Sequence, residues 1–422
     1  MAHVLVPSIV AVSILLMLVR PLGIAEVYWI SGGVLLLIVL QLVSFNLAAK
    51  AIAKGSDVYF FLIGMMLLSE LAREHGVFDW LSSFAVRSAR GSCRRLFVLV
   101  YGIGTVVTIF MSNDATAVVL TPAILAAVRK AKVEPLPYLF VCALIANAAS
   151  FVLPISNPAN LVVFHDGMPP LGHWLLSFAV PSLLSILSTY VVMRWIFRQE
   201  LAQSIGHEVE NKQLDDDGKL VLGGLTAMIV VLLTASALGK DLGLPTCLAA
   251  IALTAAMSIK ARINPLKLAK EISWGTIALV AGLFIMVDAV ESIGALRLTQ
   301  AALLWVQHLP LAAAAFITSF AVGVANNLVN NLPLGLIAGA TLHAAHGKGL
   351  IAAAVLIGVD LGPNLSITGS LATILWLLAL RREKLDVSFW KFLRVGVLAM
   401  PVALLLSVGS AILMGLVFKV SR

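Results

Sequence analysis

Two short groups of polar residues stand inside long apolar stretches of this sequence. The first reads SNDAT over residues 112–116, and the second reads NNLVNNLP over residues 326–333. Their amide and hydroxyl groups are neutral hydrogen-bond donors and acceptors, which suit an uncharged solute that carries hydroxyl groups. A single asparagine could simply cap a turn between two helices. Four asparagines within six residues of the second group instead favour a binding site.

Each polar group is followed by an apolar segment that contains helix breakers. The first segment is interrupted by PISNPAN at 154–160, and the second by DLGPNLSITGS at 360–370. Proline inside an apolar helix removes a backbone hydrogen bond and frees carbonyl groups that other groups must satisfy. A kinked packing helix would also contain proline, but Asn and Ser crowd around both breaks. Paired broken helices in the two halves of a chain are typical of a transport site near the bilayer midplane.

The candidate substrate-binding residues come from the two polar groups and the two breaks. They are Asn113, Thr116, Ser156, Asn157, Asn327, Asn330, Asn331, Asn364 and Thr368. No Lys or Arg lies in these stretches, so a bound dianion would find no opposite charge there. Three convergent cysteines, which would hold a soft metal tightly, are not expected, because Cys93, Cys142 and Cys247 are widely spaced. The sequence contains no motif that calls for a cofactor or a structural metal.

Two carboxylates in these elements, Asp114 and Asp360, are candidates for proton coupling. An ionisable residue inside a membrane is costly and usually has a function. A carboxylate that merely caps a half-helix would also be stabilised there by the helix dipole, and the sequence leaves this alternative open. Glu70 and Asp288 are second candidates, although both fall near an expected helix end.

Composition places these elements in a lipid bilayer. Hydrophobic residues make up 60% of the 422-residue chain and charged residues 12%, and the mean hydropathy is +1.02. A water-soluble fold has no interior large enough for so many apolar side chains. The net charge is +8, but the basic residues form short clusters between apolar runs, as membrane topology requires, so no nucleic-acid partner is expected.

The sequence predicts an all-α polytopic membrane protein. About 20 residues are needed to cross a bilayer, and the run 4–19 is expected to be the first span and not a removed signal peptide. The expected spans are 4–19, 25–45, 57–74, 136–164, 172–197, 219–238, 244–259, 274–292, 349–379 and 390–418. The stretches 94–131 and 309–346 differ, because each carries its polar residues at the centre. We expect both to be re-entrant helical hairpins, and the spans 136–164 and 349–379 to be broken helices.

The two halves carry matching residues at a fixed separation. Gly64 matches Gly282, and Glu70 matches Asp288 (288 − 70 = 218). The same offset joins the two polar groups. We therefore expect an N-terminal repeat at 1–197, a polar cytoplasmic linker at 198–219 and a C-terminal repeat at 220–422, each repeat with about five transmembrane helices.

Charge predicts the orientation of the two hairpins. Basic residues concentrate on the cytoplasmic side of membrane proteins. Those flanking the first hairpin are Arg94, Arg95, Arg129, Lys130 and Lys132, whereas the second is flanked by His308, His343, His346 and Lys348. The hairpins should therefore enter from opposite faces, as inverted repeats do. Lys50 and Lys54 fall on the outer side in this scheme and do not fit it.

The order of these elements resembles the ion transporter superfamily. Within it, RRLFVLV, SNDATAVVLTP, SNPANLVV, NNLP and especially GVDLGPNLSITGSLATILWLL resemble the ArsB-type arsenite/antimonite permeases over nearly the whole chain. The resemblance implies inverted repeats in the inner membrane and export of neutral trihydroxy arsenic or antimony in exchange for protons. A separate ATPase subunit is a further partner to consider, because the chain has no P-loop of its own. Where some members carry an acid in the first broken helix this chain has Asn147, and where some carry lysine after GP it has Asn364.

Other transporters of the same superfamily remain alternatives. A sodium/proton antiporter would bind a hard cation through the same oxygen atoms. A sodium-coupled dicarboxylate transporter would need an anion-binding tip, and SNDAT places a negative charge there. An enzyme fits less well, because the sequence has no HExxH motif and no nucleophile elbow.

Overall fold

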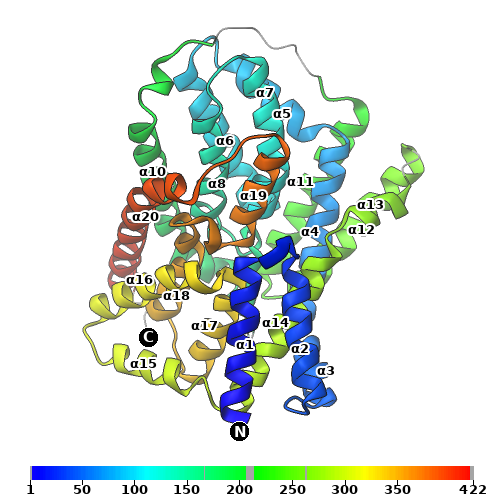
Figure 1. Cartoon of the computed structure of the whole chain (residues 1–422). Coiled ribbons are helices and arrows are strands. Elements are labelled where there is room, and N and C mark those ends of the chain that lie inside the picture. The colour runs from blue at the N-terminus through cyan, green and yellow to red at the C-terminus, as the bar shows by residue number, and fades with distance from the viewer. Residues whose placement is uncertain (1, 166, 206–212, 262–263, 419–422) are drawn as a thin grey trace.

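The computed structural model describes residues 2–165, 167–205, 213–261 and 264–418, and every regular element within these ranges is a helix (Figure 1). In the first half the helices are α1 (Ala2–Val19), α2 (Glu26–Val39), α3 (Phe45–Lys54), α4 (Ser56–Glu74), α5 (Val77–Ser88), α6 (Cys93–Met111), α7 (Thr121–Lys130), α8 (Leu136–Ala148), α9 (Pro158–Val163) and α10 (Leu171–Ile196). In the second half they are α11 (Asp216–Ala237), α12 (Gly243–Lys260), α13 (Pro265–Glu271), α14 (Trp274–Ser292), α15 (Arg297–Gln307), α16 (Leu311–Val329), α17 (Asn331–Ala344), α18 (Leu350–Leu361), α19 (Leu371–Arg382) and α20 (Phe389–Phe418).

The helices are those of a multi-pass membrane protein. Within the described residues, seven helices are long and apolar enough to cross a bilayer. The number of spans is eight if α3 and α4, which are bent by 52° relative to each other, form one span. Helices α1, α2, α8 and α18 are apolar but shorter. Many large apolar side chains face outward, such as Val191 and Leu405, as expected where lipid is the solvent. The predicted all-α membrane fold is confirmed.

The two halves have matching helices. Helix α14 starts and ends 218 positions after α4, since Ser56 matches Trp274 and Glu74 matches Ser292 (292 − 74 = 218). The same shift relates α6 to α16 at both ends. Figure 1 shows α6 and α7 in the upper part of the molecule and α16 and α17 in the lower part, so the two hairpins enter from opposite ends.

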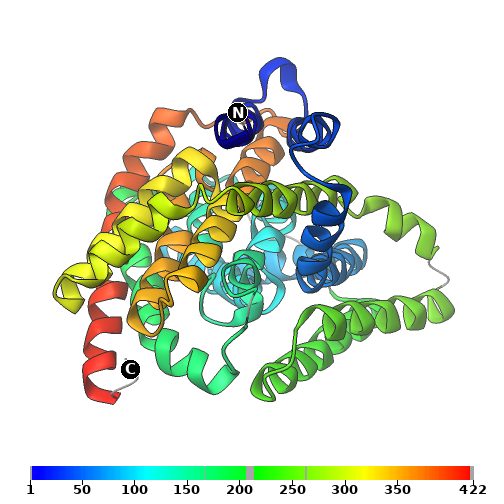
Figure 2. The same ribbon diagram turned by 90° about the horizontal axis from the view of Figure 1, so that it is seen from below.

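Corresponding helices of both halves pack into two groups. One group brings α4 against α12 and α14 against α2 and α3, with α1 and α11 beside them. The other contains the hairpins, the broken helices and the long pair α10 and α20, which lie along each other. In the view from below, α11 and α12 stand apart from the hairpin group (Figure 2). The hairpins and broken helices, which carry the polar residues, thus belong to one group of helices, and the second group of helices flanks the first.

Two charged features differ from the sequence expectation. The linker predicted over 198–219 ends earlier, because α11 begins at Asp216 and the Asp215 side chain caps it by accepting from the Gly218 amide at 2.7 Å; residues 206–212 lie outside the described residues. Lys54, which did not fit the charge pattern, forms an ion pair with Asp288 of α14 at 2.9 Å. This pairing compensates a positive charge on a predicted outer side.

Candidate transport site

The two hairpins turn at residues with the same unusual backbone. Ser112 follows α6 with φ 110° and ψ 159°, and Asn330 follows α16 with φ 81° and ψ 152°. L-amino acids rarely adopt positive φ, and such residues often mark functional sites. After the turn, the first hairpin continues through a π-helical segment, Ala115–Leu120, into α7, whereas the second continues directly into α17. The tips therefore share a backbone turn and differ in the helix that follows.

The first broken helix loses its regular hydrogen bonds between α8 and α9. The Asn160 amide donates to three carbonyls of the break, those of Ser150 (2.9 Å), Leu153 (3.2 Å) and Pro154 (3.2 Å). Helix α10 supplies two more donors: Ser185 to the Ala148 carbonyl and Trp174 to the Phe151 carbonyl. A buried carbonyl left without a partner is costly, so these donors allow the break to exist inside the protein. Asn160 was not among the predicted site residues, although it lies in the SNPAN stretch.

The second broken helix is tied to the tip of the second hairpin. The Asn327 amide donates to the Gly362 carbonyl at 3.1 Å, and its oxygen accepts from the Ser366 hydroxyl at 2.7 Å. The Thr368 hydroxyl donates to the Asn327 carbonyl at 2.9 Å. Asn326, which the site prediction omitted, donates to the carbonyls of Gly358 and Val359. Asn327 and Thr368 are therefore brought together, and Asn330 joins them through a 3.3 Å bond to the Thr368 carbonyl.

The two broken helices meet in the protein interior. The Asn147 amide donates to the Asn364 side-chain oxygen at 2.9 Å, and the Asn364 amide donates to the Leu144 carbonyl at 3.0 Å. Close by in sequence, the Asn157 amide donates to the Asp360 carboxylate at 2.6 Å. Asn147, Asn364 and Asp360 have no exposed surface, and Asn157 has 1%. These bonds join the two halves through two buried pairs, Asn147 with Asn364 and Asn157 with Asp360.

Asn147 and Asp360 occupy matching positions of the two halves. The 3-10 turn Pro154–Ser156 in the first break corresponds to Ile367–Gly369 in the second (367 − 154 = 213). The same shift relates Asn157, which caps α9, to Ser370, which caps α19. It also relates Asn147 to Asp360. The pseudo-symmetric site therefore carries an amide on one side and a carboxylate on the other.

Several side-chain oxygens near the tips and breaks are buried without a hydrogen-bond partner among the described residues. They are Asn113 Oδ1, Asn147 Oδ1, Asn160 Oδ1, Asn326 Oδ1, Asn331 Oδ1 and Asp360 Oδ2. The Ser150 hydroxyl, which lies beside Asp360, donates to the Asn147 carbonyl at 2.8 Å. An unsatisfied buried polar atom costs roughly 1–3 kcal/mol and calls for an explanation. These oxygens would be explained if they accept hydrogen bonds from the hydroxyl groups of a solute, or accept a transferred proton.

The remaining predicted residues are placed differently. The Thr116 hydroxyl lies 2.8 Å from that of Thr108 within the first hairpin. The Ser156 hydroxyl donates to the Ile109 carbonyl at 2.9 Å. Both hydroxyls thus join elements of the first half. Asp114 is half-buried, and among the described residues its carboxylate forms no hydrogen bond or ion pair.

The second-rank carboxylates are engaged in ion pairs. Glu70 pairs with Arg73 on the same helix, and Asp288 pairs with Lys54. The two large cavities near the ends of the molecule, of about 530 and 490 Å³, are lined by other residues and do not contain the tips. The hydrogen-bond network between the broken helices therefore defines the candidate site better than cavity size does.

Comparison with known proteins agrees with a transporter. The CitMHS family, described as "Citrate transporter", matches residues 4–360. "Arsenical pump membrane protein" of Escherichia coli is 26% identical over 359 residues, covering 81% of this chain and 82% of that protein. The protein of the same name from Yersinia enterocolitica is 25% identical over 353 residues, covering 80% and 81%. These relatives confirm the resemblance to ArsB-type permeases.

A solved structure supports the fold. The Alcanivorax borkumensis YdaH transporter superposes with a TM-score of 0.58 at 15% identity, covering 89% of this chain and 88% of that one. Since the family match spans most of the sequence, the chain is a membrane transporter that belongs to the citrate transporter (CitMHS) family.

Proposed function

We propose that this transporter exports neutral arsenite or antimonite hydroxide from the cytoplasm in exchange for protons. The observation that carries the proposal is the buried contact between the broken helices, where Asn147 bonds to Asn364 and Asn157 bonds to a single carboxylate, Asp360. A trihydroxy metalloid needs neutral donors and acceptors, and amides provide both. The names of the curated relatives favour the same class of substrate.

The family description raises citrate as a second candidate substrate. A citrate or dicarboxylate anion would carry two or three negative charges into the site, and anion sites usually contain Arg or Lys. Neither tip and neither break contains a basic residue, and Asp360 adds a further negative charge. Electrostatic repulsion therefore argues against a polyanion here.

Proton exchange follows from the energetics of a neutral cargo. A neutral solute gains nothing from the membrane potential, so uphill export requires a charge that moves inward. We assign this proton to Asp360 and not to Asp114. Asp360 is fully buried and contacts both halves, whereas Asp114 has no side-chain partner among the described residues.

Everted membrane vesicles test this proposal. In them, export appears as uptake, and an acid-inside gradient should drive arsenite and antimonite uptake above that of vesicles without the transporter. Citrate and succinate uptake should stay at background, with or without a sodium gradient. Sodium-driven citrate uptake without arsenite uptake would show that the substrate assignment is wrong. Uptake that depends on ATP after the proton gradient is collapsed would indicate a separate ATPase subunit.

A further inference from the structure

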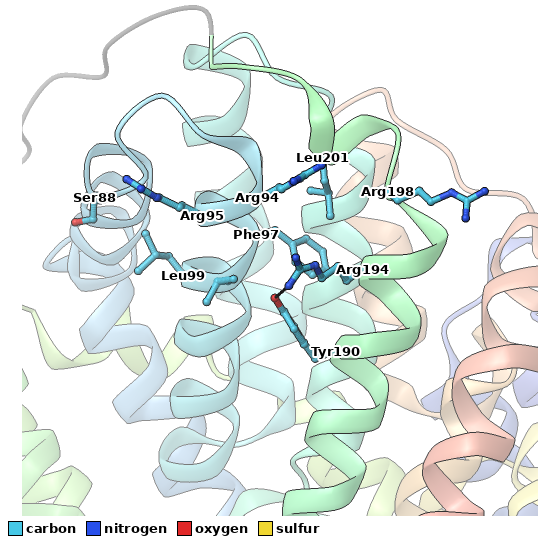
Figure 3. Close-up of a pocket in the computed structure, with 10 residues that line it drawn as sticks. Ser88, Arg94, Arg95, Phe97, Leu99, Tyr190, Arg194, Arg198 and Leu201 are labelled. Carbon is cyan, nitrogen blue, oxygen red and sulfur yellow. Dashed lines mark hydrogen bonds between the residues drawn. The ribbon is translucent and has the colours of Figure 1, made fainter.

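A large cavity at the end of α6 and α10 is lined by four arginines. It has a volume of about 530 Å³. Arg94 and Arg95 come from the first turn of α6, Arg194 from the last turn of α10, and Arg198 from just beyond it. Figure 3 shows the Arg94 side chain running toward Leu201 and the Arg194 side chain reaching the Tyr190 hydroxyl, while Arg95 lies on the α5 side and Arg198 points outward.

These arginines lack acidic partners in the described part of the chain. The arginines that form ion pairs there are Arg20, Arg73, Arg129 and Arg381. Within the cavity, Arg194 donates to the Tyr190 hydroxyl at 3.3 Å, and Arg198 lies over the Trp195 ring, 5.7 Å from its centroid. Several like charges held close together without a carboxylate repel one another. An anion between them would relieve this repulsion.

Apolar side chains complete the lining of the cavity. Phe97, Val98 and Leu99 line it together with the arginines, and the Phe97 ring packs against Tyr190 with centroids 5.8 Å apart. Val98 is 50% exposed, and Trp195 is 58% exposed. A basic rim together with an apolar wall matches a molecule with an anionic head and hydrocarbon chains. A soluble anion would not need the apolar wall.

We propose that this arginine cavity binds the phosphate headgroup of an anionic membrane lipid, with the acyl chains lying along α6 and α10. Guanidinium groups bind phosphate through paired, charge-assisted hydrogen bonds. Basic pockets between transmembrane helices at the cytoplasmic surface are suited to anionic lipid headgroups. Arginines placed only to orient the chain would have no need to line a common cavity.

A pair of charge-matched variants tests the proposal. Arg94→Gln/Arg194→Gln removes two charges from the cavity, and Arg382→Gln/Lys391→Gln removes two exposed charges elsewhere. The full-length protein in neutral detergent is titrated with phosphatidylglycerol, phosphatidylcholine or inorganic phosphate, and binding is followed by native mass spectrometry and thermal unfolding. We expect wild-type protein and the control variant to bind phosphatidylglycerol and to unfold at higher temperature with it. The cavity variant should bind phosphatidylglycerol at least roughly tenfold more weakly than the wild-type protein, because two charged hydrogen bonds are lost.

The other outcomes overturn the proposal. Equal weakening in both variants would mean that the lipid responds to overall charge and not to this cavity. Equal binding of phosphatidylcholine would remove the role of the anionic headgroup. If inorganic phosphate at the same concentration raises the unfolding temperature as much as the lipid does, the ligand is a soluble anion. Unchanged binding by the cavity variant, with its unfolding temperature preserved, would place the lipid elsewhere.

Discussion

The side-chain amide of Asn157 in the first half donates to the carboxylate of Asp360 in the second, with Nδ2 and Oδ1 2.6 Å apart. The opposite atom of the same amide, Oδ1, caps α9 by accepting from the Ala159 backbone amide at 3.0 Å. Asn157 therefore links the start of a half-helix to a buried carboxylate of the other half. A change in the charge of Asp360 therefore alters the hydrogen bond to the residue that caps α9.

The two roles of Asn157 can be separated by substitution. Asn157→Asp keeps a capping oxygen but replaces the amide donor with an oxygen that repels Asp360. We expect a folded protein with at least tenfold slower gradient-driven arsenite uptake, as loss of one charge-assisted hydrogen bond predicts. Asn264→Asp is a matched control, because Asn264 caps α13 in the same way at an exposed site. Normal transport by Asn157→Asp would exclude the bond to Asp360 from the transport cycle.

Replacing Asp360 with asparagine removes the proposed proton carrier. Asn retains the size of the side chain but cannot titrate, so gradient-driven uptake should fall to background while downhill arsenite exchange continues. Asp386→Asn, which alters an exposed carboxylate paired with Arg381, should transport normally. If Asp360→Asn retains gradient-driven uptake and Asp114→Asn loses it, the proton is carried by the first hairpin tip.

The matching positions of Asn147 and Asp360 allow the carboxylate to be moved between the halves. In Asn147→Asp/Asp360→Asn the site keeps one carboxylate and one amide, and the Asn364 side chain can turn its amide toward the new acid. We expect the double variant to recover part of the uptake that Asp360→Asn loses, measured in the same vesicles. Recovery no greater than that of Asp360→Asn alone would show that the site is functionally asymmetric.

Glycine at the first hairpin tip tests the backbone strain at Ser112. Its φ of 110° favours a residue without a Cβ atom, so Ser112→Gly should raise the free energy of unfolding by about 1 kcal/mol. Ser112→Ala, which removes the same hydroxyl but keeps the Cβ atom, should give no such gain. Thermal unfolding in detergent measures both, and a stability gain in Ser112→Ala would assign the effect to the hydroxyl instead.

Cysteine labelling tests the orientation of the hairpins. The three native cysteines are buried and can be replaced by alanine to give an unlabelled background. Single cysteines at Arg95 and Arg129 should react with a membrane-impermeant reagent only from the cytoplasm, and those at Pro310 and His346 only from outside. Labelling of Arg95 and Arg129 from opposite sides would mean that this segment crosses the bilayer once.

The sequence determined much of the architecture. Apolar runs of spanning length, proline and glycine at the breaks, and the 218-residue offset are local features, so they predicted the all-α membrane fold. The hairpin bounds 94–131 and 309–346 stay predictions. The polar groups of the tips were selected as candidate site residues for the same reason. Their side chains stand out against apolar neighbours, and membrane burial makes them costly unless they act.

Only the tertiary structure decided which polar groups meet. The contacts of Asn147 with Asn364 and of Asn157 with Asp360 join residues separated by 217 and 203 positions. Such contacts depend on how the broken helices cross. In addition, the offset between the repeats changes from 218 at the hairpins to 213 at the breaks, so a search with one fixed offset does not pair Asn147 with Asp360. The same is true of Asn160, Trp174 and Ser185, because the carbonyls that need their donors become known only once the chain is folded.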